Sequence, residues 1–268
     1  MTTLQFTTER VLIWGKTYPE LSTTYAETVC TAGVRKDGTP VRLYPVPLRY
    51  LESGYSLYDW IEAPICKSGR DNRPESFKVD AAKIQTVSSI PTDESGWAGR
   101  AEYVFKDPSW QFENVGALKA AQQETGRSLG IVTPGAIEGV HIAYKAKDDE
   151  KRHKEKMKAI QDQQSLFLEE FKELAFRPFD VKLRWRCAGG CPECSNQPHD
   201  MKVLDWGLLE LSRKNGWDPA PAKDRLEKLA GSGNYDFKLF LGNLKKHRAS
   251  FLPVAIWYPK RQLQTRLL

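Results

Sequence analysis

Three cysteines and one histidine lie within a single short stretch of the chain, and these residue types hold transition metals in proteins. Cys187, Cys191, Cys194 and His199 have the spacing Cys-x3-Cys-x2-Cys-x4-His. Thiolate and imidazole groups are zinc ligands, and four of them complete a closed structural site. Glycines and a proline between them allow the tight turns that such convergence needs. The pattern predicts that these four residues bind Zn²⁺.

Two other metal centres share part of this pattern. The three cysteines resemble the iron–sulfur triad of radical S-adenosylmethionine enzymes, but there most of a large barrel follows the triad. Here too little chain remains after Cys194. A catalytic zinc would keep a position open for water and need a nearby base, such as Glu193, Asp200 or Asp205. With four ligands present, the closed structural site is favoured.

Two basic runs accompany the cysteines. Residues 179–186 alternate between apolar and polar side chains, which predicts a strand with one buried face; its other face carries Lys182, Arg184 and Arg186. The second run lies near the C-terminus and consists of Lys245, Lys246, His247 and Arg248. Both runs suit contacts to phosphate. The lysines of the second run equally suit the C-terminus of a helix, which we expect over residues 237–246.

The N-terminal third contains a clear hairpin signal. Asp37-Gly38 lies between two strand-like runs and predicts a two-residue turn. Pairing outward from this turn sets Gly33 opposite Arg42 and puts Tyr44 on the same face. A missing side chain opposite an arginine can mark the close approach of a ligand, or simply a bulge or a packing need. Arg42 and Tyr44 are therefore candidate ligand contacts.

A charged loop follows the next predicted strand. It contains Arg70 and Arg73, whose guanidinium groups are suited to bidentate contacts with a phosphate. The same two arginines could instead pair with Asp71 and Glu75 and hold the loop in place.

The hairpin also carries a family resemblance. Val29-Cys30-Thr31-Ala32-Gly33, then Asp37-Gly38 and Val41-Arg42-Leu43-Tyr44-Pro45, resemble the opening of certain bacterial OB-like or PUA/ASCH-like proteins. The resemblance covers only the first third of the chain and implies a nucleic-acid-reading β-barrel. Tyr44 stands between Arg42 and Pro45, which departs from the Arg-Pro pattern of that family.

The order of the elements predicts an α+β fold. Many short strands, one of them expected over residues 101–105, frequent turns and one helix up to residue 144 favour a small β-barrel-like domain. We expect this helix over residues 115–124, with Asn114 as its cap and Gly126 as its stop. Residues 147–156 alternate in charge, and apolar residues at near-helical spacing follow up to Leu174, which predicts a charged helical connector over residues 145–178. Residues 179–268 are expected to form a zinc-stapled, mainly helical part. Its expected helices are 201–213, 222–229 and 237–246, and it closes on an edge strand at 251–258.

The composition of the chain narrows the classes of function that it can have. The net charge of +6 favours association with polyanions such as DNA or RNA, but a lysine-rich surface alone also explains it. The sequence has no apolar run long enough to cross a membrane and no secretory signal at its start. Cysteines clustered in this way fit a reducing cytoplasm. We expect a cytoplasmic protein.

Three classes of function remain open. The first is a zinc-containing nucleic-acid-binding protein, with a bacterial mobile-element or phage-defence system as the hypothetical setting. The second is a nucleic-acid-processing enzyme, a nuclease or base-excising hydrolase, with Asp205 or Glu75 as its carboxylate. The third is a zinc-scaffolded module that binds a protein partner. The sequence favours the first class and leaves the question of enzyme activity open.

Overall fold

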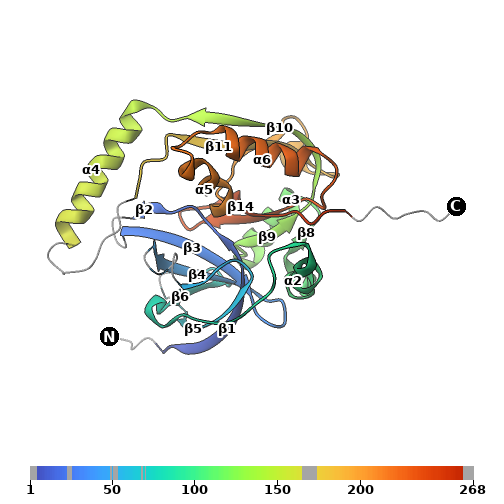
Figure 1. The fold of residues 1–268 in the computed structure, drawn as a ribbon. Helices are drawn as coiled ribbons and strands as arrows, with labels where there is room; N and C mark the ends of the chain where they lie inside the picture. The colour runs from blue at the N-terminus through green and yellow to red at the C-terminus, as the bar shows by residue number, and fades with distance from the viewer. Residues whose placement is uncertain are drawn as a thin grey trace.

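A computed structural model of the protein describes residues 5–22, 26–48, 50, 54–67, 69, 71–164 and 174–261. The chain forms a barrel at the N-terminal end and a mixed α/β part that packs on top of it (Figure 1). None of the helices in these ranges is long and apolar enough to cross a membrane.

The N-terminal part is a small five-stranded β-barrel, as predicted. Strand β1 (Thr7–Lys16) pairs with β3 (Ala26–Val34) and also with β5 (Asp59–Cys66), which closes the barrel. Between β3 and β5 lie β4 (Pro40–Pro47) and β6 (Ser76–Val79). The β4–β6 pairing is parallel, and the other barrel pairings are antiparallel. Two outer strands extend the sheet, β2 (Glu20–Ser22) beside β3 and β7 (Gln85–Ser89) beside β5.

The β3–β4 hairpin corrects the predicted register. The turn is one residue longer than expected and includes Gly38, whose φ of 90° lies in the left-handed region that glycine tolerates. Gly33 therefore pairs with Val41, and Arg42 pairs with Ala32. The predicted pairing of Gly33 with Arg42 is wrong. The small residue at position 33 is needed because a Cβ there would lie within 2.5 Å of the backbone oxygen of Leu12.

Two helices connect the barrel to the rest of the chain. Helix α2 (Trp97–Val104) replaces the strand expected over residues 101–105. Helix α3 (Val115–Thr125) confirms its prediction at both ends. The Asn114 side chain accepts a hydrogen bond from the backbone N–H of Ala117 at 2.9 Å, and Gly126 ends the helix in the left-handed conformation.

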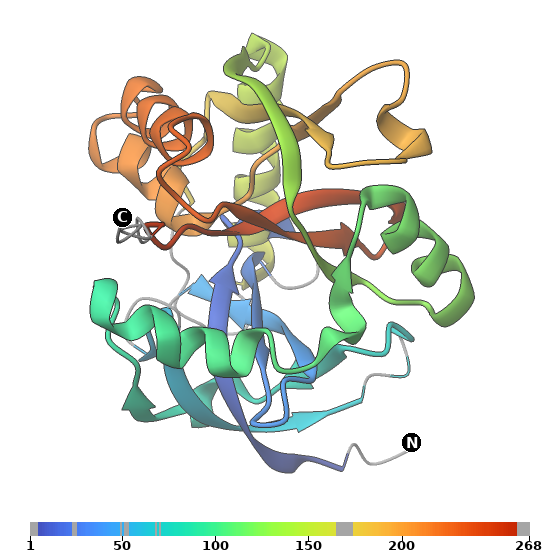
Figure 2. The same ribbon diagram turned by 90° about the vertical axis from the view of Figure 1, so that its right-hand side faces the viewer.

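The C-terminal part contains two antiparallel or mixed sheets as well as helices, so the expectation of a mainly helical part is wrong. One sheet has the order β14 (His247–Trp257), β13 (Lys238–Leu244), β9 (Leu129–Val132) and β8 (Gln111–Phe112). The other consists of β10 (Pro134–Tyr144), β11 (Phe179–Cys187) and β12 (His199–Lys202). Helices α5 (Trp206–Lys214) and α6 (Ala220–Gly231) pack beside them (Figure 2).

Individual elements of this part differ from expectation in an informative way. The helix expected over residues 237–246 is strand β13, and the one expected from residue 201 begins only at Trp206, after β12. The helix over 222–229 and the closing edge strand are confirmed by α6 and β14. Helix α4 (Lys147–Gln164) forms the first part of the expected charged connector. The pairing of β10 with β11 joins residues on both sides of the predicted division at residue 144.

Aromatic packing fixes the barrel against the four-stranded sheet. Trp14 on β1 stacks on Phe240 of β13 with ring centroids 4.5 Å apart, and Trp110 packs against both rings. All three side chains are almost completely buried. Large aromatic side chains contribute strongly to such contacts because each buries a large apolar area. The two parts therefore share a core, which positions the cleft described below.

Candidate metal centre and basic cleft

The four predicted metal ligands converge on one point. Strand β11 ends at Cys187, and β12 begins at His199, which pairs with Trp185. The turn between the strands supplies Cys191 and Cys194. The four ligand atoms all lie within 4.8 Å of one another, with Cys187 Sγ 3.4 Å from His199 Nε2. Tetrahedral zinc with bonds of about 2.3 Å separates its sulfur ligands by about 3.8 Å. This grouping is confirmed, and it could hold a metal ion such as zinc.

The start of helix α3 contacts the thiol groups. The backbone N–H of Val115 points to Cys187 Sγ at 3.5 Å. Burial still raises the pKa of Cys187 to about 12. Burial also raises the pKa of Cys191, but hydrogen bonds that include the backbone N–H of Gly116 outweigh it, so that this pKa is lowered. Burial lowers the pKa of His199 and favours the neutral imidazole that a metal needs. A helix N-terminus stabilises thiolate.

The surroundings of the cluster fit a closed site. Cys191, Cys194 and His199 are buried, and the ring of Trp185 lies 4.6 Å from the imidazole. Glu193, one of the candidate bases, forms an ion pair with Lys119 of α3. A metal here would tie β11, β12 and α3 together.

A basic cleft of about 630 Å³ lies between the barrel and the four-stranded sheet. Its lining contains six lysine or arginine side chains and a single carboxylate, together with His247 and the aromatic residues Tyr18, Tyr44 and Phe77. The cationic residues are Arg42, Arg73, Lys78, Lys156, Lys245 and Lys246, and the carboxylate belongs to Asp71. The structure thus brings together six residues that the sequence singled out in separate motifs.

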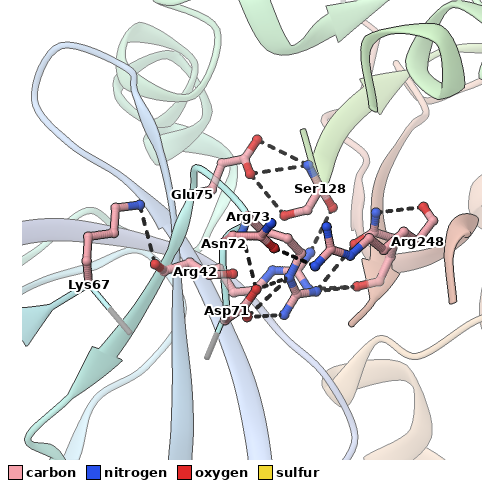
Figure 3. A network of polar contacts seen from close by, with 10 residues as sticks. Arg42, Lys67, Asp71, Asn72, Arg73, Glu75, Ser128 and Arg248 are labelled. Carbon is pink, nitrogen blue, oxygen red and sulfur yellow. Dashed lines mark hydrogen bonds and ion pairs between the residues drawn. The ribbon is translucent and has the colours of Figure 1, made fainter. Parts of the chain in front are cut away.

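Arg42 lies at the floor of the cleft and connects the two parts of the protein (Figure 3). It is only 5% exposed and donates to the backbone carbonyls of Asn243 at 2.7 Å and Ser128 at 2.8 Å. Burial lowers the pKa of Arg42, and neighbouring Arg73 lowers it further, while Glu75 and Asp71 oppose the shift. Its guanidinium group therefore adds positive charge to the floor while its hydrogen bonds hold the sheet.

The sequence left open whether Arg73 contacts a phosphate or pairs with an acidic residue, and in the structure Arg73 forms such an ion pair. Its guanidinium forms a bidentate contact with Asp71, with the shorter bond at 2.6 Å, and so holds the loop. It also donates to the backbone carbonyl of Asn243 at 2.9 Å. The Asn243 side chain in turn donates to the carbonyl of Arg248, whose own guanidinium contacts Asn72 (Figure 3). This network attaches the β13–β14 hairpin to the barrel.

The hairpin turn carries three exposed cationic or titratable side chains of the cleft. Lys245, Lys246 and His247 lie at its tip, where the helix C-terminus was expected. Within the described ranges, no carboxylate forms an ion pair with either lysine, nor with Lys78 or Lys156. Unpaired lysines at the mouth of a recess leave a positive field available to an anionic ligand.

The basic stripe on β11, which consists of Lys182, Arg184 and Arg186, differs from these lysines because its side chains are paired with carboxylates. Lys182 pairs with Asp200 at 2.7 Å, and Glu138 on β10 accepts from both Arg184 at 3.2 Å and Arg186 at 2.6 Å. Two carboxylates thus offset two of the three positive charges on the face that the sequence presented as cationic. Contact between this stripe and nucleic acid stays a prediction.

The carboxylates considered for an enzyme have structural partners. Glu75 is buried and accepts from the backbone N–H and hydroxyl of Ser128, which holds the loop against β9. Asp205 caps helix α5 by accepting from the backbone N–H of Leu208 at 2.8 Å. Burial raises the pKa of Asp205 to about 6, against its hydrogen bonds. Arg70 lies outside the described residues.

Several residues of the cleft were not predicted. Lys78 and Lys156 come from β6 and α4 and have no neighbouring motif in the sequence. Asn243 is 1% exposed and anchors the hairpin through both its backbone and its side chain. Only contacts between residues far apart in the chain reveal these roles, so a single sequence carries no signal for them.

The chain is thus an α+β protein with an N-terminal five-stranded barrel and a Cys3His cluster in its mixed C-terminal part. Residues 111–268 match the model of a family described as a domain of unknown function (DUF8757), and the chain belongs to this family. Residues 7–106 match a second domain of unknown function (DUF8758), which corresponds to the barrel and α2. A comparison with curated proteins found no match.

Proposed function

We propose that the protein binds nucleic acid, DNA or RNA, in the basic cleft, with a zinc ion as a structural element of the C-terminal part. The observation that carries the proposal is the charge of the cleft lining, where six cationic side chains surround one carboxylate. Phosphate backbones provide most of the affinity of nucleic acids for proteins, and lysine and arginine are the usual contacts.

The position of the cleft supports the same proposal. It opens beside a small five-stranded barrel, an architecture that includes the OB folds and that the sequence resemblance suggested. Tyr44 lines it as a half-buried aromatic ring, which is suited to contact a base. Phe77 lines it too, but Lys67 and Arg35 already lie over its ring. Glu75 and Asp205 serve structural contacts, so we favour binding over catalysis. The mobile-element or phage-defence setting stays a prediction.

Fluorescence anisotropy with labelled single-stranded and duplex DNA and RNA, repeated at increasing salt, tests the proposal. We expect at least one of these ligands to bind, with an affinity that falls steeply as salt rises because counterions are released from the phosphates. Absence of binding to all of them at low salt would contradict the proposal, and so would an affinity independent of salt.

A further inference from the structure

A second cavity adjoins the basic cleft. It has a volume of about 860 Å³ and lies between α4, β2 and residues 174–180. Tyr18, Leu21 and Lys156 line both this cavity and the cleft. Lys156 is exposed at this junction, and no ion pair involves it within the described part of the chain. The two hollows therefore meet at these three residues.

The second cavity differs in chemistry from the cleft. Its lining holds three carboxylates beside five lysine or arginine side chains. Arg152 pairs with Asp149 at 2.9 Å and Arg177 pairs with Asp180 at 2.7 Å. Its distinguishing side chain is Phe176, which is half-buried against the ring of His153. The Lys145 ammonium lies 5.4 Å from the Phe176 ring centroid.

The basic cleft and the second cavity together suit a single strand of nucleic acid better than a duplex. Cavities of these volumes have the size of small-molecule sites, which admit single nucleotide units. Arg42 and Arg73 are each 5% exposed at the inner wall, so phosphates on the outside of a duplex would meet only the rim. Proteins that bind single strands combine a positive groove with aromatic rings on which bases stack.

We infer that the cleft and the second cavity form one continuous groove for single-stranded nucleic acid, with a phosphate at Lys156 and a base against Phe176. The inference rests on the proposed function and adds to it the class of ligand and its path. It implies that a strand must be long enough to pass the Lys156 junction before it gains the contact with Phe176.

The test measures anisotropy of labelled oligothymidylates of about three and about twelve nucleotides, and of a blunt duplex of about twelve base pairs. We compare the wild-type protein with the variants Lys156→Ser and Phe176→Ala. Lys83→Ser serves as the control because its exposed ammonium is already paired with Asp80 at 3.0 Å and lies outside both cavities. Lys156→Ser changes an exposed side chain, so this variant is expected to fold even if Phe176→Ala does not.

We expect the long oligonucleotide to bind more tightly than the short one and than the duplex. Both groove variants should weaken binding of the long strand, Phe176→Ala by roughly ten-fold, and they should weaken it more than binding of the short strand. The control variant should bind both strands as the wild-type protein does. Tighter binding of the duplex would overturn the inference, as would equal effects of Lys156→Ser on both lengths. In these cases the proposed function stands if affinity still depends on Lys245 and Lys246. Failure of every ligand to bind would instead overturn the proposed function itself.

Discussion

Arg73 donates a hydrogen bond to the backbone carbonyl of Asn243, a residue 170 positions further along the chain, at 2.9 Å. The bond connects a loop of the barrel to the base of the hairpin that carries Lys245 and Lys246. Asp71 neutralises the same guanidinium group. The cationic rim of the cleft is therefore positioned by a buried polar network rather than by the hairpin alone.

Replacing Arg73 with Met should lower the free energy of unfolding by about 3 kcal/mol. The change leaves the Asp71 carboxylate without its partner at a largely buried position, and breaking a buried pair costs about 3–5 kcal/mol. The matched control is Arg184→Met, because Arg184 is 54% exposed in its pair with Glu138. Exposed pairs contribute roughly 0–1 kcal/mol. Urea denaturation measures the free energy of unfolding of both variants. A loss in Arg73→Met as small as that in Arg184→Met would show that the network does not stabilise the fold.

Asp205 should make stability depend on pH in the acid range. Burial raises its pKa in the folded protein to about 6, above the ordinary aspartate value of 3.8. The folded state therefore holds more protons than the unfolded state between these values. It follows that the free energy of unfolding decreases as pH rises from about 4 to about 6, and this contribution is constant at higher pH.

The variant Asp205→Asn should remove that part of the pH dependence. Asparagine also caps helices, so the hydrogen bond to Leu208 can be kept. Relative to the variant, the wild-type protein should lose on the order of 2–3 kcal/mol between pH 4 and pH 6.5. Urea denaturation at several pH values provides the comparison, and parallel curves for the two proteins would contradict the raised pKa of Asp205.

The Cys3His cluster should hold about one equivalent of zinc per chain. Elemental analysis of the purified protein measures it. Cys194→Ser removes a buried ligand and should reduce the bound zinc below about half an equivalent, with a lower melting temperature because metal binding stabilises the folded state. Cys30→Ser is the control, since Cys30 is a free cysteine outside the cluster. Full zinc content in Cys194→Ser, or iron in place of zinc, would refute the assignment.

Features whose cause is local in the sequence were predictable. The metal ligands lie close together along the chain, so their spacing was sufficient to predict the site. Helix α3 carries its own boundaries in Asn114 and Gly126, which satisfy the helix ends without help from the rest of the fold. The alternation of apolar and polar residues over 179–186 is also local, and it correctly predicted the buried and exposed faces of β11.

Features that depend on distant neighbours were not predictable from one sequence. Strand β13 lies between β14 and β9, and Leu239, Phe240 and Leu241 are all fully buried. A strand covered on both faces reads as a continuous apolar run, which periodicity cannot distinguish from a helix. The cleft depends on contacts such as that of Arg42 with Asn243, which no local pattern encodes.

The central claim is that the cleft binds nucleic acid through its unpaired lysines. Comparing Lys245→Ser/Lys246→Ser with Arg184→Ser/Arg186→Ser tests it most directly, because both variants remove two positive charges from the surface. Anisotropy of a labelled single strand should show weaker binding by the hairpin variant and a plot of log K against log salt that is shallower by about 1.4. The β11 variant should match the wild-type protein. Equal loss in both variants, or loss only in the β11 variant, would contradict the assignment of the cleft.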